Sequence, residues 1–242
     1  MFRNPVHQAV MVLTGAILAA AFVAGSLMHQ ETPPSAGAAP NPIRMAFENQ
    51  IDDALFIIAM EKNFFQAAGV PVAAVNPQNG SSAEALFSGK ADMAAVDEST
   101  ALIALSRELP LKIIASHAVS RPGGREESSP LLILASDNLL RQRPDMVRNL
   151  LATLGRAEDF MRGNSEESAT ILGEATGLEP VPLQNSMKRH EFRLRLDAAV
   201  LAGLEARAKD LSRQGIIDRP PDLSRSADAG YLPVKDDGSP KS

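Results

Sequence analysis

The sequence SGKADMAAVDEST at residues 88–100 has the pattern of a turn, a buried strand and the start of a helix. Gly89 can end a preceding helix, and the residues just after it are polar, as in a turn. Residues 93–96 form a short apolar run, which suits a strand that is covered on both faces. The stretch therefore predicts one strand-to-helix unit of an α/β protein.

Four polar residues, Asp97, Glu98, Ser99 and Thr100, follow the carboxyl end of this predicted strand. Ser99 or Thr100 can cap the next helix by accepting a hydrogen bond from a free backbone N–H. In open α/β sheets, ligands bind where strand ends and helix N-termini meet at one crevice. We therefore expect a binding corner here, although an α/β protein has several such corners and most of them are empty.

Strands and helices alternate with short connections on both sides of this stretch. The expected strands are residues 43–47, 70–75, 93–96 and 111–115, and the expected helices are residues 52–68, 81–88 and 101–109. Ser81 or Ser82 is expected to cap the second of these helices. Such alternation predicts a doubly wound, mainly parallel sheet with right-handed crossovers.

The alternation breaks at residues 120–129, SRPGGREESS, which have no apolar period and read as an exposed connection. A strand at residues 130–135 follows. Apolar residues then recur at helical spacing, which predicts helices at residues 145–162, 166–176 and 188–213. The fold class expected for the chain is one α/β lobe.

The N-terminus carries a separate signal. Residues 9–28 contain no charged side chain and are long enough either for a secretory signal or for a membrane-spanning helix, within an N-terminal segment 1–30. Residues 31–42 are rich in Pro and Ala and read as a linker, and residues 233–242 as a flexible tail. The domain itself is expected at residues 43–232. We expect it in the periplasm, tethered to the inner membrane by residues 9–28, with signal-peptide cleavage as the alternative.

Composition excludes several functions. The formal net charge of −5 argues against a nucleic-acid partner, and the absence of cysteine removes thiolate chemistry. The four histidines show no metal-ligand spacing, and neither a nucleophile elbow nor a phosphate-binding loop is present. We therefore expect no metal, no cofactor and no enzymatic activity.

Two long segments carry a resemblance to a known family: IRMAFENQIDDALFIIAMEKNFFQAAGVPV at residues 43–72 and EALFSGKADMAAVDESTALIALSRELPLKIIAS at residues 84–116. They resemble the opening of the nitrate, sulfonate and taurine type solute-binding proteins of ABC importers, a group that also includes thiamine-precursor binders. The resemblance implies a type II periplasmic-binding-protein fold, in which two lobes close on a ligand. The second lobe would lie between the equivalents of residues 119 and 129, where this chain has only a short connection. The sequence thus resembles a solute-binding protein reduced to its first lobe.

The resemblance also implies where a ligand would be contacted. The implied ligand-binding residues are Glu48, Asn49, Gln50, Asn79, Ser81, Ser82, Asp97, Glu98, Ser99 and Thr100. Free helix N-termini at this corner would suit an anion, whereas the acidic side chains oppose one. The alternative interpretation is that these residues are solvated loop acids and ordinary helix caps.

Two functions from different classes remain open. The first is a non-catalytic, solute-binding-protein-like domain that recognises a small organic solute weakly, or with the help of an ABC permease or another membrane protein complex. The second is a tethered accessory subunit of a membrane complex that has lost solute binding. An enzyme is a third class, but no residue constellation supports it.

Overall fold

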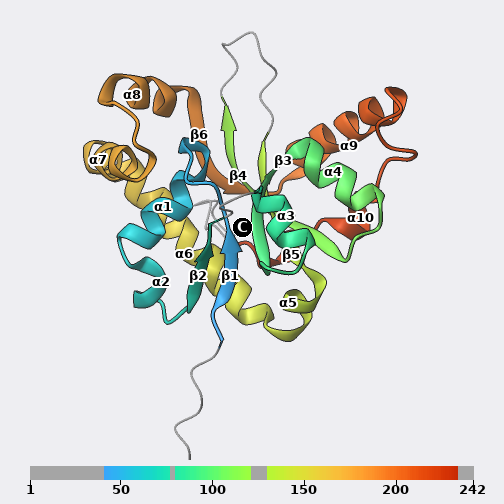
Figure 1. The fold of residues 1–242 in the computed structure, drawn as a ribbon, viewed down its shortest axis with the longest axis horizontal. Coiled ribbons are helices and arrows are strands. Elements are labelled where there is room, and N and C mark those ends of the chain that lie inside the picture. Colours follow the sequence, from blue (N-terminus) through green and yellow to red (C-terminus); the bar gives the residue numbers. More distant parts are fainter. Residues whose placement is uncertain (1–40, 77–79, 121–129, 234–242) are drawn as a thin grey trace, which may run out of the picture. The chain divides into compact units, whose positions relative to one another are not determined.

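The computed structural model describes residues 41–76, 80–120 and 130–233, and in these residues six strands form one sheet (Figure 1). The strands are β1 (Ile43–Ala46), β2 (Val72–Val75), β3 (Met93–Asp97), β4 (Leu111–Ser120), β5 (Leu131–Ser136) and β6 (His190–Arg195). Their order across the sheet is β2-β1-β3-β5-β4-β6. Strand β1 pairs in parallel with β2 and β3, whereas β5 pairs antiparallel with β3 and β4, and β6 pairs antiparallel with β4. Strands β1 to β4 therefore run in one direction, and the predicted fold class is confirmed.

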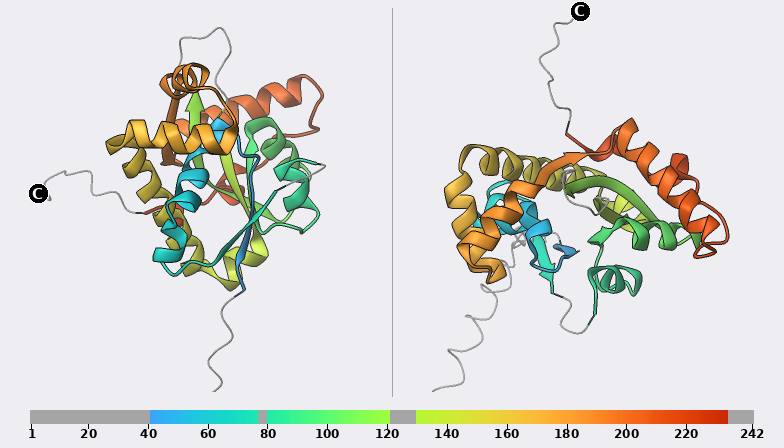
Figure 2. Two further views of the ribbon diagram at one scale, coloured as in Figure 1. Left: turned by 60° about the vertical axis from the view of Figure 1, so that its left-hand side comes forward. Right: turned by 90° about the horizontal axis from the view of Figure 1, so that it is seen from above.

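Helices cover both faces of this sheet (Figures 1 and 2). One face carries α1 (Ala54–Glu61), α2 (Phe64–Ala67), α6 (Pro144–Gly163), α7 (Ser165–Thr176) and α8 (Pro180–Arg189). The other carries α3 (Ser82–Phe87), α4 (Glu98–Ser106), α9 (Ala198–Arg213) and α10 (Leu223–Ser226). The remaining short elements are α5 (Asp137–Gln142) and two 3-10 helices, η1 (Ile51–Asp53) and η2 (Ala229–Tyr231).

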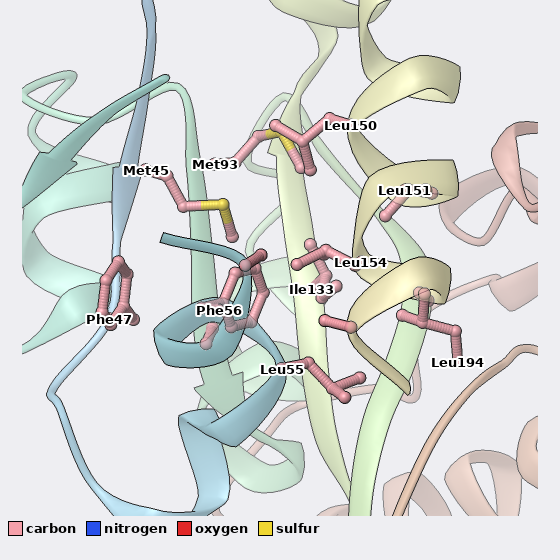
Figure 3. Packing of buried hydrophobic residues seen from close by; sticks show 14 of the residues in the cluster. Met45, Phe47, Leu55, Phe56, Met93, Ile133, Leu150, Leu151, Leu154 and Leu194 are labelled. Carbon is pink, nitrogen blue, oxygen red and sulfur yellow. The ribbon is translucent and has the colours of Figure 1, made fainter. Parts of the chain in front are cut away.

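The two helical layers bury two apolar clusters, one on each face of the sheet. Successive residues of β5 alternate between them: Ile133 packs into the cluster beneath α1 and α6, and Leu132 and Leu134 pack into the cluster beneath α4 and α9. All three are 0% exposed. This two-sided burial explains why the strand reads as a continuous apolar run rather than as an alternating one. Figure 3 shows the first cluster, with Phe56 and Leu154 facing the sheet.

The prediction of one helix over residues 188–213 is wrong. The chain leaves α8 at Arg189, extends as strand β6 and re-enters a helix at Ala198. Strand β6 pairs with β4, and Asp197 caps α9 by accepting a hydrogen bond from the backbone N–H of Val200 at 3.0 Å. Pairing with a neighbouring strand outweighs the local helical periodicity here, because it satisfies the backbone groups of a segment that also carries strand-forming residues.

Several further boundaries differ from the predictions, and two of these differences have a clear structural cause. The helix expected at residues 52–68 is divided at Asn63, whose φ of 55° is left-handed, and this residue separates α1 from α2. Strand β4 continues to Ser120, beyond the predicted end at residue 115. The pairing of β4 with β6 accounts for this extension, since His190 lies opposite Ser120.

The expectations for residues 1–40, 77–79, 121–129 and 234–242 lie outside the described residues, and so does the predicted membrane segment at residues 9–28. Among the helices that the structure describes, none combines the length and apolar character needed to cross a bilayer.

Candidate functional site

A cavity of about 240 Å³ lies where β1 and β3 end and where α3 and α4 begin. We call it the Glu48 cavity. It is lined by Glu48, Gln50, Asp52, Asp53, Ser81, Ser82, Ala83, Ala95, Val96, Asp97, Thr100 and Leu131. The cavity thus lies at the corner of the sheet where the sequence predicts a binding site, and its lining includes many of the predicted residues.

Three of the predicted residues that the structure describes, Asn49, Glu98 and Ser99, do not line the cavity. Asn49 has a left-handed φ of 53° and turns the loop after β1, and Asn79 lies outside the described residues. Glu98 is 7% exposed and buried in the first turn of α4. The Ser99 hydroxyl accepts a hydrogen bond from the Arg207 guanidinium at 3.1 Å, so it joins α4 to α9 instead.

Asp53 shapes the wall of the cavity formed by the loop after β1. Its Oδ2 accepts hydrogen bonds from the backbone N–H of Glu48 at 2.9 Å and of Gln50 at 3.4 Å. The second bond belongs to a capping box between Gln50 and Asp53 at the start of η1. Burial raises the pKa of Asp53 to about 6, against the effect of these two N–H donors. Asp53 was not among the predicted site residues, although the spacing of Gln50 and Asp53 is a local signal for the box.

The carboxylate of Glu48 occupies the start of α3. Its Oε1 accepts hydrogen bonds from the backbone N–H of Ser82 at 3.2 Å and from the Ser82 hydroxyl at 3.4 Å. Ser81 is the N-cap residue, as predicted, and its hydroxyl accepts from the N–H of Glu84 at 3.2 Å. Two of the backbone donors at this helix end, the N–H groups of Ser82 and Glu84, are therefore bound by side chains of the chain itself.

Helix α4 is capped by Asp97 rather than by Ser99 or Thr100. The Oδ1 of Asp97 accepts a hydrogen bond from the backbone N–H of Thr100 at 2.9 Å. The predicted cap is wrong because β3 passes directly into α4, so the last residue of the strand is also the cap. Thr100 is left with its side chain at the cavity wall.

A histidine outside the cavity balances one of its acids. The Nε2 of His190 lies 2.8 Å from Oδ1 of Asp52, and its Nδ1 lies 2.7 Å from the carbonyl oxygen of Ser186. Both acceptors lack protons, so the ring makes both hydrogen bonds only in its doubly protonated form. The hydrogen bond to Asp52 raises the pKa of His190 accordingly.

The cavity keeps a negative balance after this pair is counted. Glu48, Asp53 and Asp97 line it in addition to Asp52, and no Lys or Arg is among the described residues of its lining. In the described part of the chain, no group of three or more His, Asp or Glu side chains could hold a metal ion. The site therefore offers carboxylate and hydroxyl oxygens to a ligand.

Comparison with solved structures identifies the fold. The alkanesulfonate-binding protein SsuA from Xanthomonas axonopodis pv. citri, bound to MOPS, aligns with a TM-score of 0.64 and 12% identity over 78% of this chain and 99% of that chain. A Candida albicans protein with the generic periplasmic binding protein fold, the CA3427 gene product, gives 0.65 and 11% over 81% and 99%. The desulfurization enzyme DSZB gives 0.59 and 12% over 79% and 97%. The chain therefore has the periplasmic-binding-protein fold, which both binding proteins and an enzyme share.

The comparison with protein families matches only part of the chain. Residues 50–125 match the model of the family described as NMT1/THI5 like. No curated protein matches the chain in sequence. The matched residues include η1, α3, β3 and α4, which line the Glu48 cavity, so the resemblance predicted from the sequence is supported in this part of the chain.

Proposed function

We propose that this chain is a non-catalytic solute-recognition protein of the cell envelope that binds a small organic molecule in the Glu48 cavity. The observation that carries the proposal is the position of the cavity, at the carboxyl ends of parallel strands β1 and β3 and the N-termini of α3 and α4. Ligands of open α/β sheets bind at such corners. The relationship to ABC importer components and to periplasmic binding proteins supports the same role.

The chain recognises its ligand with one lobe. The described residues build a single sheet, and only residues 121–130 stand between β4 and β5, where the family resemblance would place a second lobe. A ligand held from one side buries less surface and makes fewer favourable contacts. These contacts compensate for less of the entropy that is lost on binding, so the affinity falls. We expect affinities of about micromolar or weaker for the isolated protein. An ABC permease or another membrane protein complex would supply the missing wall.

A cavity-filling variant tests the proposal. We expect ligand-observed NMR of the mature full-length chain against a library of small amines, acids, sulfonates and pyrimidines to find weak binders. Thr100→Phe fills the cavity without changing its charge, so it should weaken these binders by about tenfold or more. Thr170→Phe, on the exposed face of α7, is the matched control and should leave binding unchanged.

The outcomes separate the two candidate functions. If binders respond equally to Thr100→Phe and Thr170→Phe, the ligand site lies elsewhere. If the library yields no binder at all, the accessory-subunit interpretation replaces solute recognition.

The location of the mature protein is part of the same proposal. We expect residues 9–28 to remain attached and to tether the domain at the membrane, with residues 31–42 as a spacer that raises its effective concentration beside a membrane partner. Mass spectrometry of the native protein should find an N-terminus at Met1 or Phe2 in the membrane fraction. An N-terminus near Leu27 or Ala39 would instead show cleavage and a released domain.

A further inference from the structure

We propose that the Glu48 cavity selects a small organic cation, a primary ammonium compound, whose charged group binds Asp53 together with Glu48 and Asp97. The inference rests on the proposed function, because it names the chemical class of the solute. Four features of the cavity support it: an unused oxygen of the buried residue Asp53, the balance of charge, the carboxylates bound at the two helix ends and the volume.

The first feature is a buried carboxylate with one oxygen unused. Asp53 is 3% exposed and lines the cavity. Its hydrogen bonds from the backbone N–H of Glu48 and Gln50 both use Oδ2, and no hydrogen bond within the described residues uses Oδ1. Buried carboxylates are stable when a donor or a counter-charge meets them. An ammonium group in the cavity would supply both to Oδ1.

The second feature is the lack of a fixed cation at the lining. Asp52 is paired with His190, whereas none of the described lining residues is a Lys or Arg that could neutralise Glu48, Asp53 or Asp97. Like charges that line one cavity repel one another, and the repulsion is stronger where burial excludes water. A bound cation would relieve that repulsion, and a bound anion would add to it.

The third feature is the state of the helix ends. Glu48 accepts from the first N–H of α3, and Asp97 accepts from the N–H of Thr100 in α4. A sulfonate or nitrate would have to compete with these carboxylates for the N–H groups of Ser82 and Thr100. An ammonium group donates three hydrogen bonds and needs none of these N–H groups, since it can reach carboxylate oxygens and the hydroxyl oxygens of Ser82 and Thr100.

The fourth feature is volume. The cavity of about 240 Å³ equals the share of liquid volume taken by roughly eight water molecules. A solute with a comparable number of non-hydrogen atoms would fill it. The expected ligand is therefore a short aliphatic or cyclic amine rather than a large cofactor.

Three probes of equal chain length test the charge preference: 1-butylamine, 1-butanol and 1-butanesulfonate. Binding to the mature full-length chain is followed by NMR titration at pH 7.5 and low salt. We expect butylamine to bind about tenfold or more tighter than butanol, as charge-assisted hydrogen bonds require, and butanesulfonate to bind more weakly than butanol.

The variant Asp53→Asn assigns the preference to the unused oxygen. An asparagine keeps one oxygen to accept from the N–H groups of Glu48 and Gln50, so the loop should retain its fold, which the backbone NMR spectrum checks. Butylamine affinity should fall about tenfold or more, while butanol affinity should stay within about twofold. Asp145→Asn, which removes the same charge at the exposed start of α6, is the control and should change neither affinity.

The possible results distinguish the cation inference from the proposed function. Tighter binding of butanesulfonate or butanol than of butylamine would overturn the cation inference and leave solute recognition intact. The cation inference would also be overturned if Asp53→Asn did not weaken the binding of butylamine, because the ammonium group would then bind at other residues. If none of the three probes binds and the library screen also finds no binder, both proposals are wrong.

Discussion

Phe56→Ala is expected to lower the free energy of unfolding by about 3–5 kcal/mol, the cost of truncating a fully buried aromatic side chain. Phe56 is 1% exposed and lies in α1, one turn after the cavity residue Asp53. Its ring stacks on Phe47 at a centroid distance of 5.7 Å and meets the ring of His117 edge-on at 5.0 Å. Figure 3 shows it among the apolar side chains that join α1 to the sheet. Urea unfolding followed by circular dichroism measures the loss.

Phe87→Ala is the matched control for this substitution. Phe87 ends α3 and is 42% exposed, so its truncation should change the free energy of unfolding by no more than about 0.5 kcal/mol. Similar small effects of both substitutions would contradict the packing of α1 on the sheet. The comparison matters for function because α1 follows η1 directly and so fixes the position of the acidic wall of the cavity.

The central strands were predictable because their burial is two-sided. A strand covered on both faces is a short run of apolar residues, and β3 and β5 both have this form. The position of β5 was not predictable from local pattern. Strand β5 lies between β3 and β4 and runs antiparallel to both, and this order depends on pairings between segments that are far apart in sequence.

The local sequence pattern of strand β6 is compatible with both a helix and a strand. Phe192, Leu196 and Val200 recur at helical spacing, which predicts a helix, but Phe192 and Leu194 also alternate with Arg193 and Arg195, as in a strand. Pairing with the extended end of β4 selects the second pattern. The choice between helix and strand cannot be predicted from the local sequence, because it depends on whether β4 has a free edge beside this segment.

The site was predictable to the extent that it depends on strand ends and caps. Ser81 caps α3 as expected, and Glu48, Ser82, Asp97 and Thr100 line a cavity at the predicted corner. Asp53 was missed because its role depends on the loop after β1 folding back onto its side chain. Whether any of these residues contacts a solute stays a prediction.

A second large effect on the free energy of unfolding is expected from His117, because this histidine is buried and its protonation depends on pH. His117 is 0% exposed on β4, and neither ring nitrogen has a hydrogen-bond partner in the described residues. Burial lowers the pKa of His117 to about 4, although the charge of Asp52 acts in the opposite direction. The ring is therefore neutral in the folded protein at pH values where the unfolded chain already binds a proton.

The sign of the pH effect follows from that difference. The unfolded histidine has a pKa of about 6.5 and the folded one of about 4, so acidification from neutral pH favours the unfolded state between these values. Between pH 7 and pH 5, His117 should remove about 2 kcal/mol from the free energy of unfolding. Asp53 acts oppositely, because an acid whose pKa is raised to about 6 by folding gains stability as the pH falls through that value. Asp53 therefore offsets part of the pH dependence that His117 contributes.

The variant His117→Leu isolates the contribution of the histidine. Leucine has a similar volume and lacks the two unpaired nitrogens, so the variant should be more stable than the parent by about 1 kcal/mol or more at pH 7. Its advantage should grow by about 2 kcal/mol at pH 5, since Asp53 and all other groups titrate in both proteins and cancel in the difference. His190→Gln gives a contrast of opposite sign: the pKa of His190 is raised by Asp52, so its contribution is present at pH 5 and is lost as the pH rises above 6.5. An advantage of His117→Leu that does not change with pH would mean that His117 titrates as an exposed histidine and that β4 is not packed against Phe56.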